Sequence, residues 1–229
     1  MWQSGQRRFA VITRRVVIVE DDPMMRGMLA TQLEDAGFEV GTAATGTDAR
    51  RLCAILDPDA LVMDIDLGAG MNGLDVADAL LSEYPHLTVL FLTHLPDTRF
   101  AGRDAQSLPR GVGYLRKESL LQPGVLVEAL DAVLRGNVTR QHRQDLDPSR
   151  PLLNLSRTQL EVLNLVAKGH TNPEIADIRG TTLRAVQALV VRTFQATGIG
   201  EHLEGPARVE AVRQFLSDSG LTIPTQTGD

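Results

Sequence analysis

The chain has 229 residues, of which 43% are hydrophobic and 23% charged, and its formal net charge is −6. This apolar fraction argues against a disordered chain, and the length fits one or two domains. The single cysteine, Cys53, excludes an internal disulfide framework, a four-cysteine zinc site and an iron–sulfur cluster. No apolar run approaches the ~20 residues of a membrane span, so we expect a cytoplasmic protein that does not contact the membrane.

The charges are unevenly distributed along the chain. Residues 1–137 hold 13 of the 23 Lys and Arg residues and 19 of the 29 Asp and Glu residues. This part therefore carries the whole net charge of −6, and residues 138–229 are neutral. An acidic half followed by a neutral half indicates two domains with different functions. If the neutral half binds nucleic acid, it must do so through a local basic patch.

Short apolar runs alternate with segments of helical period in the first half of the chain. Strands are predicted over residues 16–19, 38–42, 60–63, 89–92 and 113–115. Helices are predicted over residues 23–36, 48–56, 74–81 and 125–134. Alternating strands and helices with continuously apolar strands predict an α/β fold, a doubly wound five-stranded parallel sheet with helices on both faces.

No strand signal follows residue 137. Residues 137–151 are polar, contain two prolines and are predicted to be a linker. Later N-cap signals are Ser156 with Gln159, Thr171 with Glu174, and Thr182. They open three helices, and a fourth is predicted over residues 206–219. Two short helices separated by a tight turn that contains Gly are typical of a helix-turn-helix. The expected parts are an N-terminal extension (1–14), an α/β domain (15–136), the linker (137–151), a smaller all-α domain (152–217) and a tail (218–229).

Polar side chains follow the ends of four predicted strands. In chain order they are Glu20 and Asp21, Asp64 and Asp66, Thr93, and Lys117. Because the carboxyl ends of parallel strands lie at one edge of a sheet, we expect these groups to meet there. Crowded carboxylates repel one another, and Mg²⁺, which prefers oxygen ligands, relieves that repulsion. A carboxylate beside such an ion, a hydroxyl and an ammonium group is equipped to accept a phosphoryl group. Asp22, directly before Pro23, is assigned to a helix N-cap instead.

Five stretches of the first half form a recognisable set. They are VVIVEDDP (16–23), VMDIDL (62–67), MNGL (71–74), LT (92–93) and GYLRK (113–117). With these stretches, residues 15–136 resemble the receiver domain of bacterial two-component response regulators. The resemblance implies a flavodoxin-like receiver in which Asp64 accepts a phosphoryl group from a cognate histidine kinase. It also implies that the protein is not an enzyme beyond assisting its own phosphotransfer and dephosphorylation.

The same resemblance implies roles for individual residues. Asp21 and Asp64 would bind Mg²⁺ directly, with the main-chain carbonyl of Asp66, and Glu20 would help through water. Lys117 would contact the phosphoryl oxygens, Thr93 would move towards the phosphate, and Tyr114 would follow as an aromatic switch. Phosphorylation adds a charge of about −1.5 to −2. The modified receiver would then change its contacts with the helical domain or form a homodimer.

The sequence departs from the family pattern in three places. Gly68 stands where proline is usual, and one extra residue precedes Gly73. His94 stands where a small residue is common, and its imidazole would restrict access of water to an acyl phosphate. Residues 97–111 contain several Gly and Pro residues, so the helix expected there should be short or irregular.

A second set of stretches lies in the helical half. They are LS (155–156), EVL (161–163), AKG (167–169), TN (171–172), EIA (174–176), Val186 and GI (198–199). With them, residues 153–216 resemble the LuxR-type helix-turn-helix of NarL/FixJ-class regulators. The third helix would then enter the major groove of double-stranded DNA. The expected DNA contacts are Thr182, Arg184, Gln187, Ala188, Val191 and Arg192, with the arginines at phosphates, Gln187 at an adenine edge, and Ala188 or Val191 at thymine methyl groups.

Two alternatives remain open. Gln187 and Leu189 stand where the family usually has lysine and histidine, so the helical domain would serve protein contacts if it no longer binds DNA. Alternatively, Asp64 and Asp66 form the Asp-x-Asp pattern of a haloacid-dehalogenase-like phosphatase with an aspartate nucleophile. Against a phosphatase, the acidic pair precedes Asp64, and no Asp-rich strand end follows Lys117.

Overall fold

The computed structural model describes residues 13–68, 72–95, 97–101, 103, 108–109, 111–147, 152, 155–199 and 205–218. Contacts between residues divide the chain into two compact units. The first unit comprises residues 1–91, 111–113 and 123–137, and the second comprises residues 92–110, 114–122 and 138–229. Most of the expected N-terminal extension and of the tail lies outside the described residues.

Five strands form one sheet in the order β2-β1-β3-β4-β5. The strands are β1 (Arg15–Val19), β2 (Glu39–Ala43), β3 (Ala60–Met63), β4 (Thr88–Thr93) and β5 (Gly113–Arg116). β1 is parallel to both β2 and β3, and β3 is parallel to β4. The predicted doubly wound sheet is therefore confirmed. β2 lies on one side of β1 and β3 lies on the other, so the direction in which strands are added to the sheet reverses between β1 and β3. The carboxyl ends of these two strands therefore form a topological switch point.

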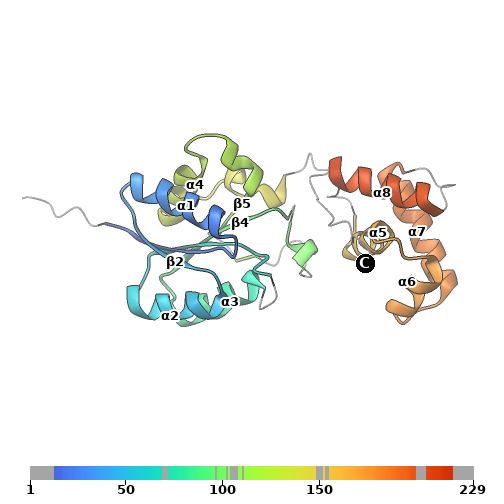
Figure 1. Ribbon diagram of the computed structural model, residues 1–229, viewed down its shortest axis with the longest axis horizontal. Helices are drawn as coiled ribbons and strands as arrows, with labels where there is room; N and C mark the ends of the chain where they lie inside the picture. Colours follow the sequence, from blue (N-terminus) through green and yellow to red (C-terminus); the bar gives the residue numbers. More distant parts are fainter. Residues whose placement is uncertain are drawn as a thin grey trace, which may run out of the picture. The chain divides into compact units, whose positions relative to one another are not determined.

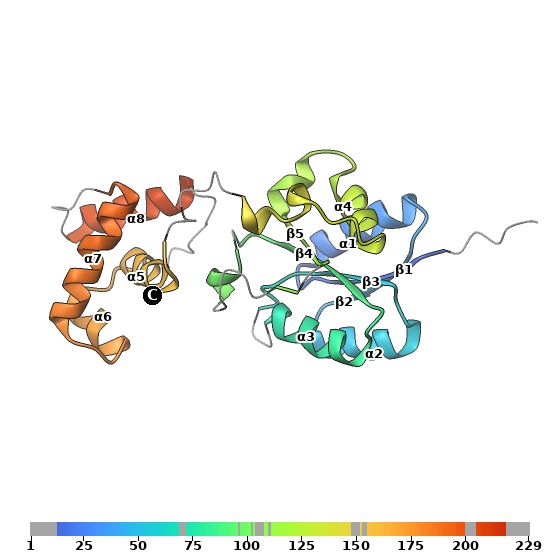
Figure 2. The same ribbon diagram turned by 180° about the vertical axis from the view of Figure 1, so that it is seen from behind.

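Four helices cover the two faces of this sheet (Figures 1 and 2). α1 (Pro23–Asp35) and α4 (Val125–Leu134) lie on one face, and α2 (Gly46–Leu56) and α3 (Gly73–Glu83) lie on the other. The Asp22 side chain caps α1, because its Oδ1 accepts a hydrogen bond of 2.7 Å from the Met25 amide. Strands β1 and β3 are almost entirely buried between these layers, which accounts for their continuous apolar sequences.

The connection between β4 and β5 is described only in part, at residues 94–95, 97–101, 103, 108–109 and 111–112. Among its described residues, the helical part is the 3₁₀ helix η1 (Thr98–Ala101). The expectation of a short or irregular helix in this segment is confirmed, and the Gly and Pro residues explain it because both disfavour helix interiors.

The described part of the predicted linker is folded and does not form a simple extended tether. It forms two 3₁₀ turns, η3 (Arg140–His142) and η4 (Gln144–Leu146), within the second unit. The Gln144 Oε1 atom accepts hydrogen bonds from the Arg116 amide at 2.8 Å and the Ser119 hydroxyl at 2.9 Å. Asp145 is buried and accepts two hydrogen bonds of 2.8 Å from the Arg143 guanidinium. These contacts are polar, so the sequence shows no apolar periodicity that would reveal them.

Four helices follow, α5 (Arg157–Ala167), α6 (Asn172–Ile178), α7 (Leu183–Thr197) and α8 (Gly205–Asp218) (Figure 2). Both predicted capping boxes are present, and the Thr182 hydroxyl accepts a hydrogen bond from the Ala185 amide at 3.2 Å. One apolar core that includes Leu163, Phe194 and Val212 joins the bundle. In the described part of the chain, no helix is long and apolar enough to cross a membrane.

Cys53 lies on the buried face of α2 and gives a simple test of the packing. Burial raises the pKa of its thiol to about 11, and the charge of Glu83 adds to the effect. Because the thiolate is the reactive form, we expect a thiol reagent at mildly alkaline pH to label the folded protein at least roughly 100-fold more slowly than the chain in denaturant. Labelling kinetics followed by intact mass check this, and equal rates in both conditions would show that α2 is not packed as described.

Candidate functional site

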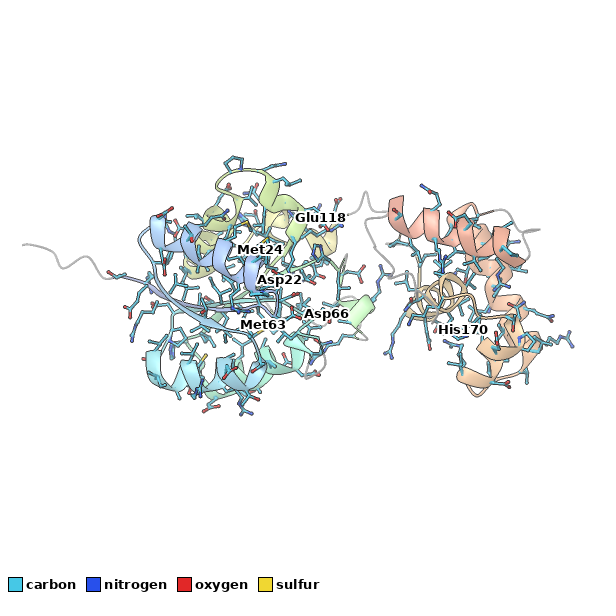
Figure 3. All side chains as sticks on the ribbon, in the orientation of Figure 1. Asp22, Met24, Met63, Asp66, Glu118 and His170 are labelled. Carbon is cyan, nitrogen blue, oxygen red and sulfur yellow. The ribbon has the colours of Figure 1, made fainter. Side chains whose placement is uncertain are left out.

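Three carboxylates gather at the switch point of the sheet. Glu20 and Asp21 directly follow β1, and Asp64 directly follows β3. One oxygen from each residue lies within 4.8 Å of the others. The carboxylates meet because β1 and β3 are paired in register, with Val19 opposite Met63. Figure 3 labels Asp22 and Met63, which mark the two strand ends beside the cluster.

Burial distinguishes the members of this cluster. Glu20 and Asp64 are only 1% and 4% exposed, whereas Asp21 is exposed. The carboxylate of Asp66 is also exposed and lies outside the three-residue cluster. Two buried carboxylates beside a third need positive charge nearby, because like charges at short range repel and burial penalises them. The donor set consists of oxygen atoms only, which fits a hard divalent cation.

Main-chain groups fix the position of Asp64. The amide of Asp66 donates a hydrogen bond of 3.1 Å to Asp64 Oδ1. The amide of Gly73, the first residue of α3, donates to the Ile65 carbonyl at 2.9 Å. A Cβ atom on Gly73 would lie 1.9 Å from the carbonyl oxygen of Asp64, so only glycine fits there. The start of α3 is therefore packed directly against the main chain of the central carboxylate.

Arg26 is a contributor that the sequence did not single out. Its Nη1 atom donates to the main-chain carbonyls of Glu20 at 2.7 Å and Asp21 at 3.1 Å. The guanidinium therefore ties the loop after β1 to helix α1. An arginine in the first turns of an exposed helix carries no signal of this role.

Thr93 and Tyr114 are both hydrogen-bonded to the main chain of Leu95. Both lie in the second unit, Thr93 at the end of β4 and Tyr114 in β5. The Thr93 hydroxyl oxygen accepts a hydrogen bond from the Leu95 amide at 3.2 Å. The Tyr114 hydroxyl donates to the Leu95 carbonyl at 2.8 Å, and both side chains are buried. A displacement of Thr93 would therefore move Leu95 and, through the Leu95 carbonyl, change the position of the Tyr114 hydroxyl.

Lys117 and His94 also belong to the second unit. Lys117 begins the 3₁₀ helix η2 (Lys117–Leu121) and is 8% exposed. His94 is exposed, and its Nδ1 atom lies 3.0 Å from Oε1 of Glu118. Burial would raise the pKa of Glu118, but the hydrogen bond with His94 and the nearby Arg116 charge lower it overall. The imidazole is thus held by a carboxylate, and its effect on water access stays a prediction.

A buried ion pair follows Thr93 and was not predicted. Asp97 and Arg99 have side chains that are 4% and 6% exposed. Arg99 donates to both carboxylate oxygens of Asp97, at 2.9 Å and 2.7 Å. It also donates to the main-chain carbonyl of Leu152 at 2.9 Å and to that of Leu155. The segment after β4 is therefore bonded to the chain that enters α5, all within the second unit. An Asp-x-Arg sequence in a loop gives no hint of this.

The residues expected to contact DNA share one face of α7. Arg184, Gln187, Ala188, Val191 and Arg192 are all exposed, as is Thr182 at the N-cap. The opposite side of the helix, with Val186 and Phe194, is buried in the bundle. Among the described residues, Arg184 and Arg192 have no ion-pair partner. The structure therefore places the six residues together on one exposed surface.

The parallel sheet with an acidic cluster at its switch point is the arrangement of a response regulator receiver domain. Comparison with family models agrees, because the response regulator receiver domain matches residues 16–130, and the chain belongs to this family. The match is to a receiver domain, and a relative is named a transcriptional regulatory protein, which favours a response regulator over the phosphatase alternative.

Similar proteins extend the likeness to both halves of the chain. The nitrate/nitrite response regulator protein NarP of Escherichia coli is 29% identical over 90% of this chain and 96% of its own length. The transcriptional regulatory protein LiaR of Bacillus subtilis is 27% identical over 88% of this chain and 98% of its own. A solved structure of two RcsB dimers bound to two parallel DNAs has the same fold, with a TM-score of 0.57 and 20% identity over 90% of this chain and 98% of that one.

Proposed function

We propose that this protein is a transcriptional regulator controlled by phosphorylation of Asp64. The observation that carries the proposal is the buried carboxylate of Asp64 in the three-residue acidic cluster. In the proposed step, an Asp64 oxygen attacks the phosphorus of a phosphohistidine on a histidine kinase. The bond between phosphorus and the histidine nitrogen breaks, and an acyl phosphate remains on Asp64.

Other residues of the site would assist this transfer. Glu20, Asp21 and Asp64, with the main-chain carbonyl of Asp66, would hold Mg²⁺. Bound Mg²⁺ supplies positive charge that stabilises the phosphoryl oxygens. In the strand order, β4 and β5 follow β3, so Thr93 and Lys117 follow Asp64 along the same edge of the sheet. There the ammonium of Lys117 and the hydroxyl of Thr93 would donate to the phosphoryl group. The same residues would assist dephosphorylation by water.

The segment after β4 would carry the signal onward. Thr93 accepts a hydrogen bond from the Leu95 amide, and Tyr114 donates one to the Leu95 carbonyl. Two residues after Leu95, Asp97 begins the buried ion pair with Arg99. Arg99 is hydrogen-bonded to the two carbonyls that precede α5. A shift of Thr93 towards a phosphoryl group would therefore move a segment that is directly bonded to the start of the helical part.

Removing the ion pair between Asp97 and Arg99 should uncouple phosphorylation of Asp64 from the change in DNA binding. The double variant Asp97→Asn/Arg99→Gln deletes both charges and leaves no buried charge unpaired. We expect this variant to be phosphorylated normally. Its DNA affinity should change less than about threefold on phosphorylation, whereas coupling between two sites typically amounts to about 5–150-fold. Fluorescence anisotropy with and without beryllofluoride measures it. The matched control is Asp131→Asn/Arg135→Gln, an exposed ion pair of α4. Full coupling in both double variants would contradict this route.

The output we propose is DNA binding by α7. The exposed face with Arg184, Gln187 and Arg192 is suited to the major groove, with arginines at phosphates and Gln187 at a base edge. RcsB, which shares the fold, has been solved with DNA. Phosphorylation would promote a homodimer, as in the solved RcsB dimers. The second candidate output is protein contact, favoured by the exposed apolar Leu183 and Val191 on this helix.

Salt-dependent binding to promoter DNA separates the two outputs. We expect Arg192→Ala to weaken binding to all sequences and to reduce the salt slope by about one, because one phosphate contact is lost. Gln187→Ala should instead cost about 1–3 kcal/mol at one base pair. Arg157→Ala, at an exposed arginine of α5, is the control. It should change neither the salt slope nor the discrimination at that base pair. If no DNA is retarded at low salt, with or without phosphorylation, protein contact is the output. Light scattering reports the dimer.

A further inference from the structure

A groove lies between the beginning of α6, the side of α7 and the beginning of α8. Its volume is about 870 Å³, within the range of about 300–1,000 Å³ that small-molecule sites occupy. Most of its lining is apolar, including Pro173, Leu183, Val190, Val191, Phe194 and Val209. Leu183 and Val191 are 43% and 41% exposed, so the groove presents apolar surface to solvent. His170, labelled in Figure 3, lies at its α6 end.

Arg208 places a partly buried guanidinium in this groove. Its Nε and Nη2 atoms are shielded from solvent and have no hydrogen-bond partner among the described residues. The guanidinium carbon lies 5.7 Å from the centre of the Phe194 ring, within the range of a cation–π contact. Burial lowers the pKa of Arg208, which shows the cost of removing this charge from water. The Oδ1 atom of Asn172, which also lines the groove, is buried and has no hydrogen-bond partner in the part of the chain that the structure describes.

A carboxylate would satisfy the guanidinium. Arginine pairs with carboxylates through two parallel N–H···O bonds, and such a pair is strongest where water is excluded. The apolar walls require a ligand with a hydrocarbon body, and Asn172 offers an acceptor to a donor on it. A phosphate of duplex DNA cannot supply the apolar body.

We propose that this groove binds a small organic acid, a carboxylate with a hydrophobic body, and that Arg208 holds its carboxylate. Gln187 and Val191 line the groove and also belong to the α7 face assigned to DNA. A bound acid would therefore compete with DNA and act as an effector separate from phosphorylation. Competition between the acid and DNA rests on the proposed function, whereas binding of the acid itself does not.

Octanoate is a suitable probe, with octanamide as the neutral analogue of the same shape. Ligand-observed NMR on the full chain should show saturable binding of octanoate and at least tenfold weaker binding of octanamide. Arg208→Gln should weaken octanoate at least tenfold, whereas Arg184→Gln, on α7 but outside the groove lining, should leave it within twofold. Val191→Asp adds a negative charge at an exposed groove position and should weaken octanoate at least fivefold without touching Arg208.

Several results would overturn the proposal. They are equal binding of octanoate to wild type and Arg208→Gln, equal binding of octanoate and octanamide, and no saturable binding at all. Residues 201 and 204 are glutamates outside the described part of the chain. If octanoate binds only to the variant Glu201→Gln/Glu204→Gln, the chain's own carboxylate fills the groove, and an external ligand is ruled out. Octanoate binding without any effect on DNA affinity would leave the site intact and contradict only its link to the proposed function.

Discussion

Replacement of Asp64 with Asn is expected to reduce phosphorylation of the chain to background. The amide that replaces the carboxylate is a poor nucleophile, and the change also removes one of the three charges that would hold a cation. The side chain keeps its size, so the packing beneath α3 should be preserved. Treatment with acetyl phosphate and Mg²⁺ followed by intact mass measurement should show one added phosphoryl group on the wild type and none on the variant.

Asp22→Asn is the matched control for this experiment. Asp22 adjoins the cluster in sequence, but its side chain caps α1 and is exposed. Asparagine caps helices as well as aspartate does, so the fold should be unchanged. The control should be phosphorylated like the wild type. Phosphorylation of Asp64→Asn at the wild-type level would mean that another residue is the acceptor, and the proposed site would have to be abandoned.

A methyl group at Gly73 should be the most damaging small change in the receiver. The added Cβ of Gly73→Ala would lie 1.9 Å from the Asp64 carbonyl oxygen and 3.0 Å from the Ile65 Cα atom. Both neighbours are main-chain atoms, so no side-chain rotation relieves the clash, and α3 must shift. We expect a loss of at least about 3 kcal/mol, at the upper end of overpacking costs. Urea unfolding followed by circular dichroism gives the change in midpoint.

The same variant should also lose phosphoacceptor activity, because α3 is packed against the main chain that carries Asp64. Gly27→Ala is the control, since a Cβ at Gly27 within α1 meets nothing within 4 Å. That change should be neutral or stabilise by about 0.5–1 kcal/mol, because alanine favours a helix interior. An unfolding midpoint of Gly73→Ala equal to that of the wild type would show that the contact between α3 and Asp64 is looser than described.

The sequence predicted the sheet well because its signals are local. Strands β1 and β3 are short, continuously apolar and buried on both faces, a pattern that few other structures produce. The cluster of Glu20, Asp21 and Asp64 followed from the same reasoning, since parallel strands bring their carboxyl ends together. The caps of α1, α5 and α6 depend on residues three positions apart, so they were also readable.

Contacts between distant segments were not predictable in this way. Arg99 bonds to carbonyls more than fifty positions later, and Gln144 bonds to residues 116 and 119. Such partners are main-chain or polar groups whose sequence has no periodicity to reveal the pairing. The close approach of Gly73 to Asp64 was missed because the space around a glycine depends on the tertiary fold.

The folded segment before α5 bears on how this regulator can be recombined with others. Designers of chimaeric sensors commonly swap output modules at an interdomain seam, and composition alone would place that seam near residue 137. A cut there separates Gln144 from the Arg116 amide and Arg143 from Tyr114, with which it forms an isolated bridge. A junction after residue 147 keeps these partners in one parent, although Arg99 would then have to donate its hydrogen bonds to carbonyls of a foreign backbone. The transplantable unit thus begins later than the polarity of the chain suggests.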